Sequence, residues 1–275
     1  MSTPSSPRPT VGILGTGAMG EALLRGLLGA GWKPEAIALA VRRPERARAL
    51  ADSSNCDVSP DPRTAAAGRR VVVVATKPRD VNDLLATLAP VIKPDQVVVS
   101  IAAGVPIKVF EEKLPGVGVI RAMPNTPALV GEGMTGMAAG RFADEAAVQA
   151  AQAVLAAVGA VRQMDEALMD AITAVSGTGP AYVFLLAEAL TEAAVREGLP
   201  RDVAEQFVHQ TVRGAGHLLT ETGRKPSDLR GQVTSPGGTT AAAVHVLEQG
   251  GFRALVEDAV RAAAERSRQL GEAGP

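Results

Sequence analysis

Four short apolar runs, each separated from the next by a stretch of helical character, constrain the N-terminal part of this chain more than any other feature. The runs are rich in β-branched residues and occupy residues 11–14, 36–41, 71–76 and 97–102. Stretches such as 18–30 and 81–88, which favour helix, lie between them. Continuous apolar runs that alternate with helices are typical of a parallel sheet buried on both faces. The pattern therefore predicts a doubly wound α/β sheet.

The chain changes character after about residue 165. Strand signals stop there, and long alanine-rich stretches follow at 180–197, 201–221 and 252–271. Their high helix propensity and few aromatic residues predict an all-helical second domain. We expect a disordered lead-in over 1–9, which is rich in Pro and Ser, an α/β domain over 10–165 and a helical domain over 166–275.

Bulk composition argues against several classes of partner. The 28 basic and 29 acidic residues give a formal charge of −1, which favours neither nucleic acid nor an anionic membrane. No run approaches the roughly 18 apolar residues of a membrane-spanning helix. The single cysteine, Cys56, excludes an internal disulfide and fits a reducing compartment. We expect a cytoplasmic protein with no membrane or nucleic-acid partner and no metal, since its His, Asp and Glu residues do not cluster in metal-ligand spacing.

The first glycine cluster follows directly on the first apolar run. In "GTGAMG", Gly15 suits a tight turn, Gly17 lets the backbone approach a pyrophosphate, and Gly20 permits close packing of a helix on a strand. Backbone N–H groups at the start of that helix, at Ala18 and Met19, would face the anion. The cluster predicts a dinucleotide site, and the alternative is a glycine-rich turn that serves packing alone.

The end of the second run indicates which dinucleotide binds. A site for NAD normally carries Asp or Glu about 20 residues beyond the glycines. This chain has Arg42 and Arg43 there instead, and guanidinium groups suit a 2′-phosphate. We therefore expect NADPH, with NADH as the alternative. Either arginine, Arg43 above all, would otherwise be the solvated start of the helix "PERARAL".

Two further segments are expected at the carboxyl edge of the sheet, where open α/β folds bind ligands. The third run ends in four residues that we expect to line the cofactor: Ala75, Thr76, Lys77 and Pro78. The stretch "RAMPNTPALVGEG" holds two prolines around Asn125 and predicts a rigid non-helical loop beside the nicotinamide or the substrate. Lys77 as a surface lysine and the second segment as a structural turn are the alternatives.

Two more glycine clusters lie in the helical part, each just ahead of a helix. The first contains Ser176, Gly177 and Thr178, with Pro180 in a first-turn position. The second, "SPGGTT", offers Ser235 as a helix cap and contains Gly237, Gly238, Thr239 and Thr240. Unpaired N–H groups at such helix starts form a cradle of carboxylate size. Close helix packing explains the small residues equally well.

Taken together, these motifs resemble the Δ1-pyrroline-5-carboxylate reductase family over nearly the whole chain. The resemblance lies in five segments: "GILGTGAMGEAL", "ATKP", "RAMPNTPALVGEG", "AVSGTGPAYVF" and, most specifically, "LRGQVTSPGGTTAAAVHVLEQGGFR". Departures are small, with Thr178 where many relatives have Ser and Thr239 where some have Ala.

The resemblance implies a Rossmann-type N-terminal domain, a helical dimerisation domain, and reduction of a cyclic imine to L-proline by NADPH or NADH. It implies a homodimer, often assembled further into decamers. Ser235, Gly238 and Thr239 are expected to hold the substrate carboxylate, with Ser176, Gly177 and Thr178 beside the same substrate. Thr240 is expected to bond the ring nitrogen and is the catalytic candidate.

Two rival functions stay open on the sequence alone. A 2-hydroxy-acid or other imine reductase could share the two-domain design, although the former usually needs a Lys or His proton donor and none lies between Ala171 and Leu190. A regulatory module that binds NADPH without turnover would not need the polar helix start at 235–240.

Overall fold

The computed structural model describes residues 8–272 and divides the chain into two compact units. The first unit runs to Gly177 and takes in the segment from Ala263 onward, whereas the second unit is Thr178–Ala262. Most of the predicted lead-in, residues 1–7, lies outside the described residues. Its last two residues are ordered, because Trp32 Nε1 donates to Pro9 O at 3.1 Å and the Arg8 guanidinium lies over the Trp32 ring.

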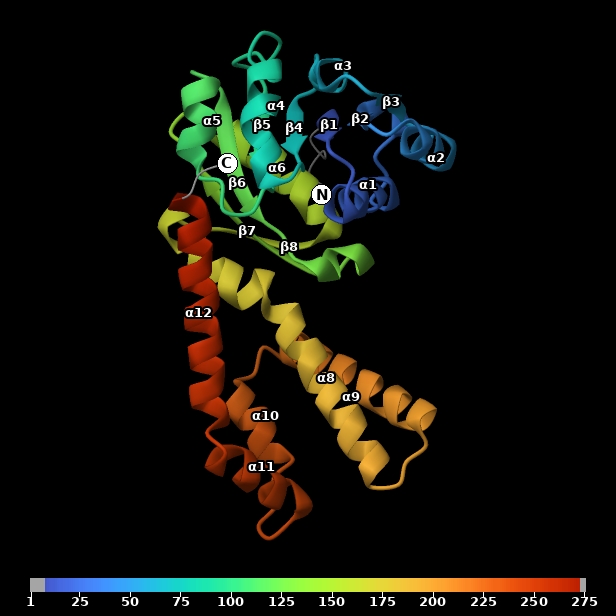
Figure 1. The fold of residues 1–275 in the computed structure, drawn as a ribbon, viewed down its shortest axis with the longest axis vertical. Helices are drawn as coiled ribbons and strands as arrows, with labels where there is room; N and C mark the ends of the chain where they lie inside the picture. Colours follow the sequence, from blue (N-terminus) through green and yellow to red (C-terminus); the bar gives the residue numbers. More distant parts are fainter. Residues whose placement is uncertain (1–7, 273–275) are drawn as a thin grey trace, which may run out of the picture. The chain divides into compact units, whose positions relative to one another are not determined.

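One eight-stranded sheet forms the centre of the first unit (Figure 1). Its order is β3-β2-β1-β4-β5-β6-β7-β8, and β1 lies between β2 and β4, parallel to both. The strands are β1 Val11–Leu14, β2 Ile37–Ala40, β3 Asp57–Ser59, β4 Val71–Val74, β5 Val97–Ser100, β6 Gly118–Met123, β7 Gly133–Ala139 and β8 Gly159–Gln163. The order of the first six is that of a Rossmann fold, which confirms the predicted fold class.

Helices cover both faces of this sheet. They are α1 Ala18–Gly29, α2 Pro44–Ser54, α3 Pro62–Ala66, α4 Val81–Leu88, α5 Ile107–Lys113 and α6 Glu145–Leu155. Helices α1, α2 and α6 pack on one face, and α3, α4 and α5 pack on the other. Alternate side chains of β4 point to opposite faces of the sheet. Val71 and Val73 pack with the first group of helices, and Val72 and Val74 pack with the second.

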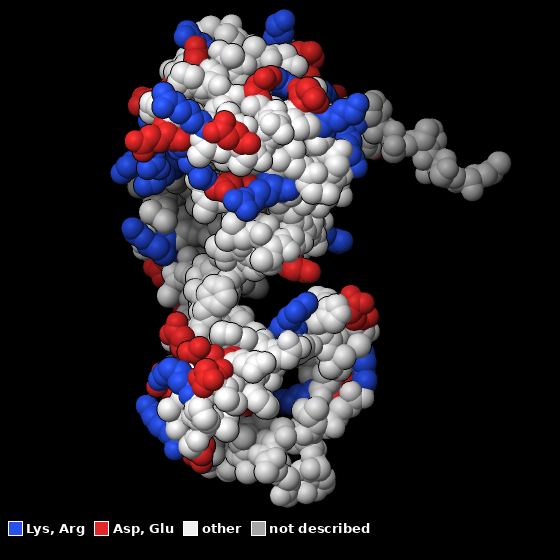
Figure 2. All heavy atoms as spheres, turned by 90° about the vertical axis from the view of Figure 1, so that its right-hand side faces the viewer, with Lys and Arg blue, Asp and Glu red and all other residues white. Residues whose placement is uncertain are grey.

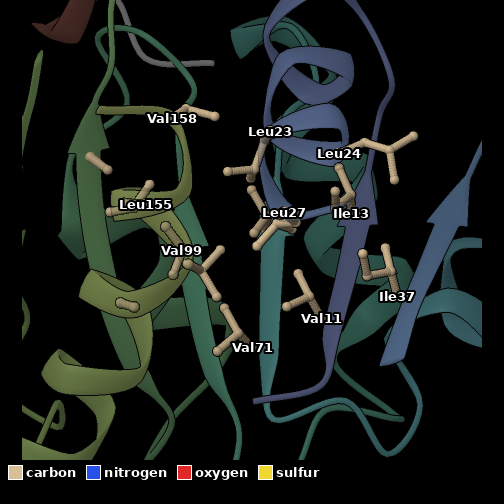
Figure 3. Packing of buried hydrophobic residues seen from close by; sticks show 14 of the residues in the cluster. Val11, Ile13, Leu23, Leu24, Leu27, Ile37, Val71, Val99, Leu155 and Val158 are labelled. Atoms are coloured by element: carbon tan, nitrogen blue, oxygen red, sulfur yellow. The ribbon is translucent and has the colours of Figure 1, made fainter. Parts of the chain in front are cut away.

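Side chains of the first face interlock between α1, the strands and the end of α6 (Figure 3). Leu23 and Leu27 of α1 pack in one cluster with Val11 of β1 and Val71 of β4. Leu155, at the end of α6, belongs to the same cluster. Leu27, Val11 and Val71 are fully buried. Burial on both faces explains why these strands are continuous apolar runs rather than alternating ones.

The sheet differs from the prediction at its far edge. Strand β7 pairs with β6 in the antiparallel direction and β8 runs parallel to β7, so the sheet is mixed. These strands lack the β-branched runs of the others, and β7 begins "GMTG", which gives a weak strand signal.

The expected non-helical loop at 121–133 is also wrong in part, because it contains the end of β6 and a 3-10 helix, η3 Thr126–Val130. Pro127 fits that first turn because it needs no N–H partner there.

The segment Glu166–Gly177 packs with the first unit, beyond the boundary expected at residue 165. It comprises η5 Glu166–Leu168, α7 Met169–Ile172 and a π-helical turn, η6 Thr173–Gly177. A Glu166 carboxylate oxygen accepts from Ile107 N at 2.8 Å and from Arg121 Nη1 at 3.1 Å, which ties the segment to α5 and β6. Such contacts join residues far apart in sequence, so a local change in composition does not reveal them.

The second unit is entirely helical and has almost no core of its own. It holds α8 Gly179–Arg196, α9 Arg201–Thr222, α10 Pro226–Gln232, α11 Thr239–Gln249 and most of α12 Phe252–Glu272. Helix α8 packs along α9. Only three of its residues are buried, namely Thr191, Ala204 and Val208. Across residues 8–272, no helix combines the length and the apolar character needed to cross a membrane.

Candidate functional site

A cleft of about 700 Å³ opens in the first unit where the chain ends of β1, β2 and β4 meet. At the carboxyl ends of the strands the chain leaves β1 toward β2 on one side and leaves β4 toward β5 on the other, and ligands of open α/β sheets bind at such a switch point. Seven predicted cofactor residues line this cleft: Gly15, Gly17, Arg42, Arg43, Ala75, Thr76 and Lys77. The cleft therefore gathers segments that lie far apart in the sequence, from Leu14 to Thr87.

The three glycines of the first cluster meet three different physical demands. Gly15 has φ +95°, a conformation that L side chains rarely adopt. A Cβ on Gly20 would overlap Gly15 O, so the close approach of α1 to the turn depends on glycine. A Cβ on Gly17 would meet no atom within 4 Å and would project into open space. Gly17 is also the N-cap of α1, whose first N–H groups, at Ala18, Met19 and Gly20, have no partner within the helix.

Thr76 supplies a second sign that a polar ligand belongs in this cleft. Its Oγ1 is buried and has no hydrogen-bond partner among the described residues. An unpaired buried hydroxyl costs about 1–3 kcal/mol, so such groups normally have a partner. Open space at Gly17, free N–H groups at α1 and this hydroxyl fit the sugar and phosphate groups of a dinucleotide.

Three arginines border the cleft at the end of β2: Arg42, Arg43 and Arg46. The sequence interpretation missed Arg46, although it follows Arg43 by three residues and Arg42 by four, the spacing of one helical turn. Arg42 Nη2 lies 3.3 Å from Asp80 Oδ2 and is largely exposed, so this exposed ion pair leaves the guanidinium available to a stronger anion.

Glu21 of α1 holds Arg46 in place. Its carboxylate accepts from Arg25 Nη2 at 2.7 Å and from Arg46 Nη2. The hydrogen bond from Arg25, with a further one from Arg46, holds the pKa of the Glu21 carboxyl below its ordinary value. Arg46 thus stands at the cleft with its charge partly balanced, whereas Arg43 has no acidic partner among the ion pairs of the described chain.

Five predicted cofactor residues lie outside the lining of the cleft: Ala18, Met19 and Gly20 in the first turn of α1, and also Pro78 and Asn125. Pro78 begins a 3-10 helix, η2 Pro78–Asp80, directly beyond Lys77. Asn125 precedes η3 and is hydrogen-bonded to Ser176 of η6 instead. Asn125 Oδ1 also accepts from Met134 N of β7, so its amide is engaged with β7 and η6, and its expected contact with the nicotinamide or the substrate stays a prediction.

The second glycine-rich segment forms a tight turn ahead of α11. Gly238 N donates to Ser235 O at 3.0 Å, and Gly237 between them has φ +69°. Pro at the second and Gly at the third position is the residue pattern of a type II turn. The N-cap of α11 is Gly238 and not Ser235, whose side chain makes no cap bond. The turn places Ser235 outside the helix, yet a Cβ on Gly238 would overlap Ser235 Oγ, so this hydroxyl lies beside the helix start.

An ion-pair network fixes the helices around that turn. Glu248 at the end of α11 accepts from Arg253 Nη2 of α12 at 2.7 Å and from Arg230 Nη1 of α10 at 3.2 Å. The bond from Arg253 lowers the pKa of the Glu248 carboxyl. The tight turn before α11 holds Ser235 beside Gly238, Thr239 and Thr240, and the first-turn N–H groups at Thr239 and Thr240 are free to bind an anion.

The remaining predicted substrate residues lie at the start of α8. Ser176 and Gly177 end the π-helical turn η6, and Thr178 is the N-cap of α8, with Pro180 in its first turn as predicted.

Groups of three or more His, Cys, Asp or Glu residues that would hold a metal ion are not found within 8–272. The three histidines are exposed and scattered along α9 and α11. The chemistry of the described groups is therefore that of hydrogen-bond donors and cations, which suits anionic ligands.

Two protein families match this chain, each over one part. The family described as pyrroline-5-carboxylate reductase dimerisation matches residues 166–270, and that described as NADP oxidoreductase coenzyme F420-dependent matches residues 10–104. Among curated proteins, a pyrroline-5-carboxylate reductase of Mycobacterium tuberculosis is 44% identical, covering 94% of this chain and 96% of that protein. One from Synechocystis is 43% identical, covering 95% and 98%.

Solved structures agree with these sequences. A pyrroline-5-carboxylate reductase from Coxiella burnetii superposes with a TM-score of 0.91 at 35% identity, covering 95% of this chain and 98% of that one. A Plasmodium falciparum pyrroline carboxylate reductase with NADP bound gives a TM-score of 0.85 at 29% identity, covering 96% and 98%. The resemblance drawn from the sequence motifs is confirmed.

The geometry of the first glycine cluster predicts that alanine substitutions at Gly17 and Gly20 have different effects. Gly20→Ala should lower the free energy of unfolding by about 1–3 kcal/mol, because the new Cβ overlaps backbone. Gly17→Ala should change it by only about 0.5 kcal/mol, the difference between Gly and Ala at an N-cap. Gly17→Ala should nonetheless weaken dinucleotide binding, since its Cβ enters the cleft. Thermal unfolding and calorimetric titration with NADPH measure the two effects, and equal losses of stability in both variants would contradict the geometry.

Proposed function

The chain belongs to the pyrroline-5-carboxylate reductase family, and from this membership we propose how its residues carry out that reaction. It is an oxidoreductase that reduces the cyclic imine 1-pyrroline-5-carboxylate to L-proline, the last step of proline synthesis, with NADPH as cofactor. The observation that best supports the assignment of roles is the presence of two glycine-rich helix starts, at α1 and α11, each with unpaired backbone N–H groups. One suits a pyrophosphate, and the other suits a small carboxylate.

The cofactor is held by groups of the first unit. Free N–H groups at the start of α1 bind the pyrophosphate, with Gly17 allowing its close approach. The guanidinium groups of Arg42 and Arg43 bind the 2′-phosphate, and Thr76 Oγ1 gains a partner among the cofactor's polar groups. When bound, the reduced nicotinamide supplies the hydride.

The substrate is held by the turn before α11. Ser235, Gly238 and Thr239 hold the carboxylate with hydroxyl and backbone donors, and Ser176, Gly177 and Thr178 contribute to the same substrate. Thr240 hydrogen-bonds the ring nitrogen. The ring nitrogen already carries a proton taken from water, and the ring carbon of the C=N bond gains the hydride. The π electrons of that bond become the nitrogen lone pair, so the product is a secondary amine.

Positioning supplies most of the acceleration in this scheme. A protonated imine is already electrophilic, so holding the acceptor carbon in the correct orientation is the main requirement. This explains why a strong acid or base is not needed among the site residues. A 2-hydroxy-acid reductase would need a proton donor, and the stretch from Ala171 to Leu190 contains neither Lys nor His.

The reaction and the role of Thr240 are tested together. The purified protein should oxidise NADPH when pyrroline-5-carboxylate is added, followed by the absorbance of the reduced nicotinamide, and should leave 2-keto acids unreduced. Thr240→Ala should lower kcat by about tenfold or more, because a hydrogen bond to the reacting nitrogen is lost. The affinity for NADPH should stay within about twofold, since Thr240 belongs to the second unit and is not among the residues that line the cleft.

Thr240→Ser provides the matched control. It keeps a hydroxyl at the same place and should recover most of the lost turnover. Unaltered kinetics in Thr240→Ala would remove Thr240 from the mechanism, and brisk NADPH oxidation with a 2-keto acid but none with the imine would overturn the reaction.

Cofactor preference is tested at the arginines. Replacement of Arg42 or Arg43 by Ala should raise the KM for NADPH by about 10-fold or more, the effect of losing a charged hydrogen bond, and should change the KM for NADH far less. Replacement of Arg46 should have a smaller effect in the same direction, because Glu21 already balances its charge. Equal rises for both cofactors would show that these side chains do not contact the 2′-phosphate.

We also propose that the second unit forms a homodimer. Large apolar side chains are exposed along its helices, including Phe184 and Leu185 on α8, Phe207 on α9 and Leu255 on α12. A helical unit with three buried residues cannot stabilise itself alone, so a second copy of the chain supplies the missing core. Decamers built from such dimers are the larger assembly that this family membership suggests.

Disrupting this apolar surface should change the mass of the protein in solution. Leu185→Asp places a charge on a side chain that is 66% exposed in the single chain, so the fold of one chain tolerates it, whereas an apolar interface does not. Light scattering should give two or ten chains for the wild type and smaller species for the variant. Leu129→Asp, at a side chain of the first unit that is 57% exposed, is the control and should leave the mass unchanged. A monomeric wild-type protein would contradict the proposal.

A further inference from the structure

Asn125 connects three segments of the first unit through one side-chain amide. Its Oδ1 accepts a hydrogen bond from Met134 N of β7 at 2.9 Å. Its Nδ2 donates to Ser176 O at 3.1 Å and lies 3.3 Å from Ser176 Oγ. The residue itself stands between β6 and η3, so it links that junction to β7 and to the π-helical turn η6.

The direction of these hydrogen bonds is fixed by chemistry. A backbone N–H can only donate, so the amide atom that faces Met134 N must be the oxygen. The NH2 group therefore faces Ser176, and it can only donate. Ser176 Oγ accepts from it, which leaves the hydroxyl proton of Ser176 to be donated elsewhere.

Ser176 lies in a turn that packs against β6. Gly177, the next residue, lies so close to Met123 that a Cβ there would come within 2.6 Å of Met123 Cε. Ser176 itself is partly exposed. Single π-helical turns within helices occur frequently at functional sites, because the extra residue redirects side chains. The turn η6 thus presents the Ser176 hydroxyl, which accepts from Asn125 and keeps its proton for another partner.

We propose that Asn125 is a positioning residue that holds the Ser176 hydroxyl as a hydrogen-bond donor to the substrate carboxylate. The inference rests on the proposed function and replaces the cofactor contact expected for Asn125 from the sequence. A carboxylate accepts hydrogen bonds only, so a serine whose proton is already directed outward binds it without first breaking another bond. Asn125 acts through Ser176 and does not touch the substrate.

A purely structural role for Asn125 makes a different prediction. If the amide served only to hold β7 and η6 together, its loss would lower stability and the fraction of active enzyme, and hence kcat, and would leave the substrate KM unchanged. A positioning role raises the substrate KM. The two roles therefore separate in the kinetic constants.

Asn125→Asp is the informative variant. The Asp side chain keeps an oxygen for Met134 N but places a second oxygen toward Ser176, so the Ser176 hydroxyl would donate to it and no longer to the substrate. We expect Asn125→Asp and Ser176→Ala each to raise the KM for pyrroline-5-carboxylate about tenfold, with the KM for NADPH within about twofold. In the double variant the rise should stay near tenfold, because both changes remove one donated hydrogen bond. Calorimetric titration with L-proline in the presence of NADP⁺ should show the same loss in affinity without turnover.

Gln96 offers a matched control in the same unit. Its Oε1 accepts from Lys93 N at 2.8 Å and its Nε2 donates to Ala66 O at 2.9 Å and to Arg69 O, so it too joins three backbone sites. Gln96→Glu should lower the thermal stability at least as much as Asn125→Asp and leave both KM values unchanged. Asn125→Ala, which cannot introduce a charge, serves if Asn125→Asp does not fold, and should raise the substrate KM in the same way.

The outcomes separate this inference from the function on which it rests. An active wild-type enzyme in which Asn125→Asp keeps its substrate KM, or in which the effects of the two substitutions multiply to about a hundredfold, would overturn the positioning role alone. A rise in the KM for NADPH in place of that for the imine would do the same. A wild-type enzyme that does not reduce pyrroline-5-carboxylate would overturn the proposed function and this inference with it.

Discussion

Burial of both faces of the central sheet is the constraint on which the rest of the first unit depends. Helices α1, α2 and α6 cover one face and α3, α4 and α5 the other, so strand residues on either side are apolar. Polar groups can then gather only where strands end. At one such edge the connections diverge from β1 and β4, and this leaves the cleft that Gly17, Thr76 and the arginines line.

Elsewhere on the surface in view (Figure 2), positively and negatively charged residues alternate, which agrees with the near-zero net charge.

The recognition of anions that we propose for this chain uses main-chain donors more than catalytic side chains. Helix starts at α1 and α11 both follow glycines that adopt positive φ or leave open space. The N–H groups there are rigid, since the helix fixes them, and they bear only partial charge, so they bind a phosphate or a carboxylate without supplying an acid or a base. Reduction of an activated imine needs little more than this, because orientation contributes the larger share of the rate.

The second unit buries very few residues, in contrast to the sheet of the first unit. Three buried residues in Thr178–Ala262 cannot offset the conformational entropy lost by five helices. Its exposed leucine, valine and phenylalanine side chains are too numerous for a free surface and have the composition of an interface core. The helices around the turn at Ser235 are nevertheless tied by Glu248 to Arg230 and Arg253, so the local geometry of that turn is set within the chain itself.

Local features of the sequence determined most elements of the fold and the glycine-rich turns at which we propose that ligands bind. Runs such as 71–74 must be buried strands because of their composition, and Gly15, Gly20 and Gly237 stand where a side chain would be strained or would overlap backbone. Tertiary structure alone decided what depends on distant partners. It reversed β7 and β8 against β6, brought Arg46 to the cleft beside Glu21, and joined Asn125 to Ser176. The physical reason is that φ preferences and hydrophobic periodicity act over a few residues, whereas a hydrogen bond between residues 125 and 176 exists only once the packing of the whole sheet has brought them together.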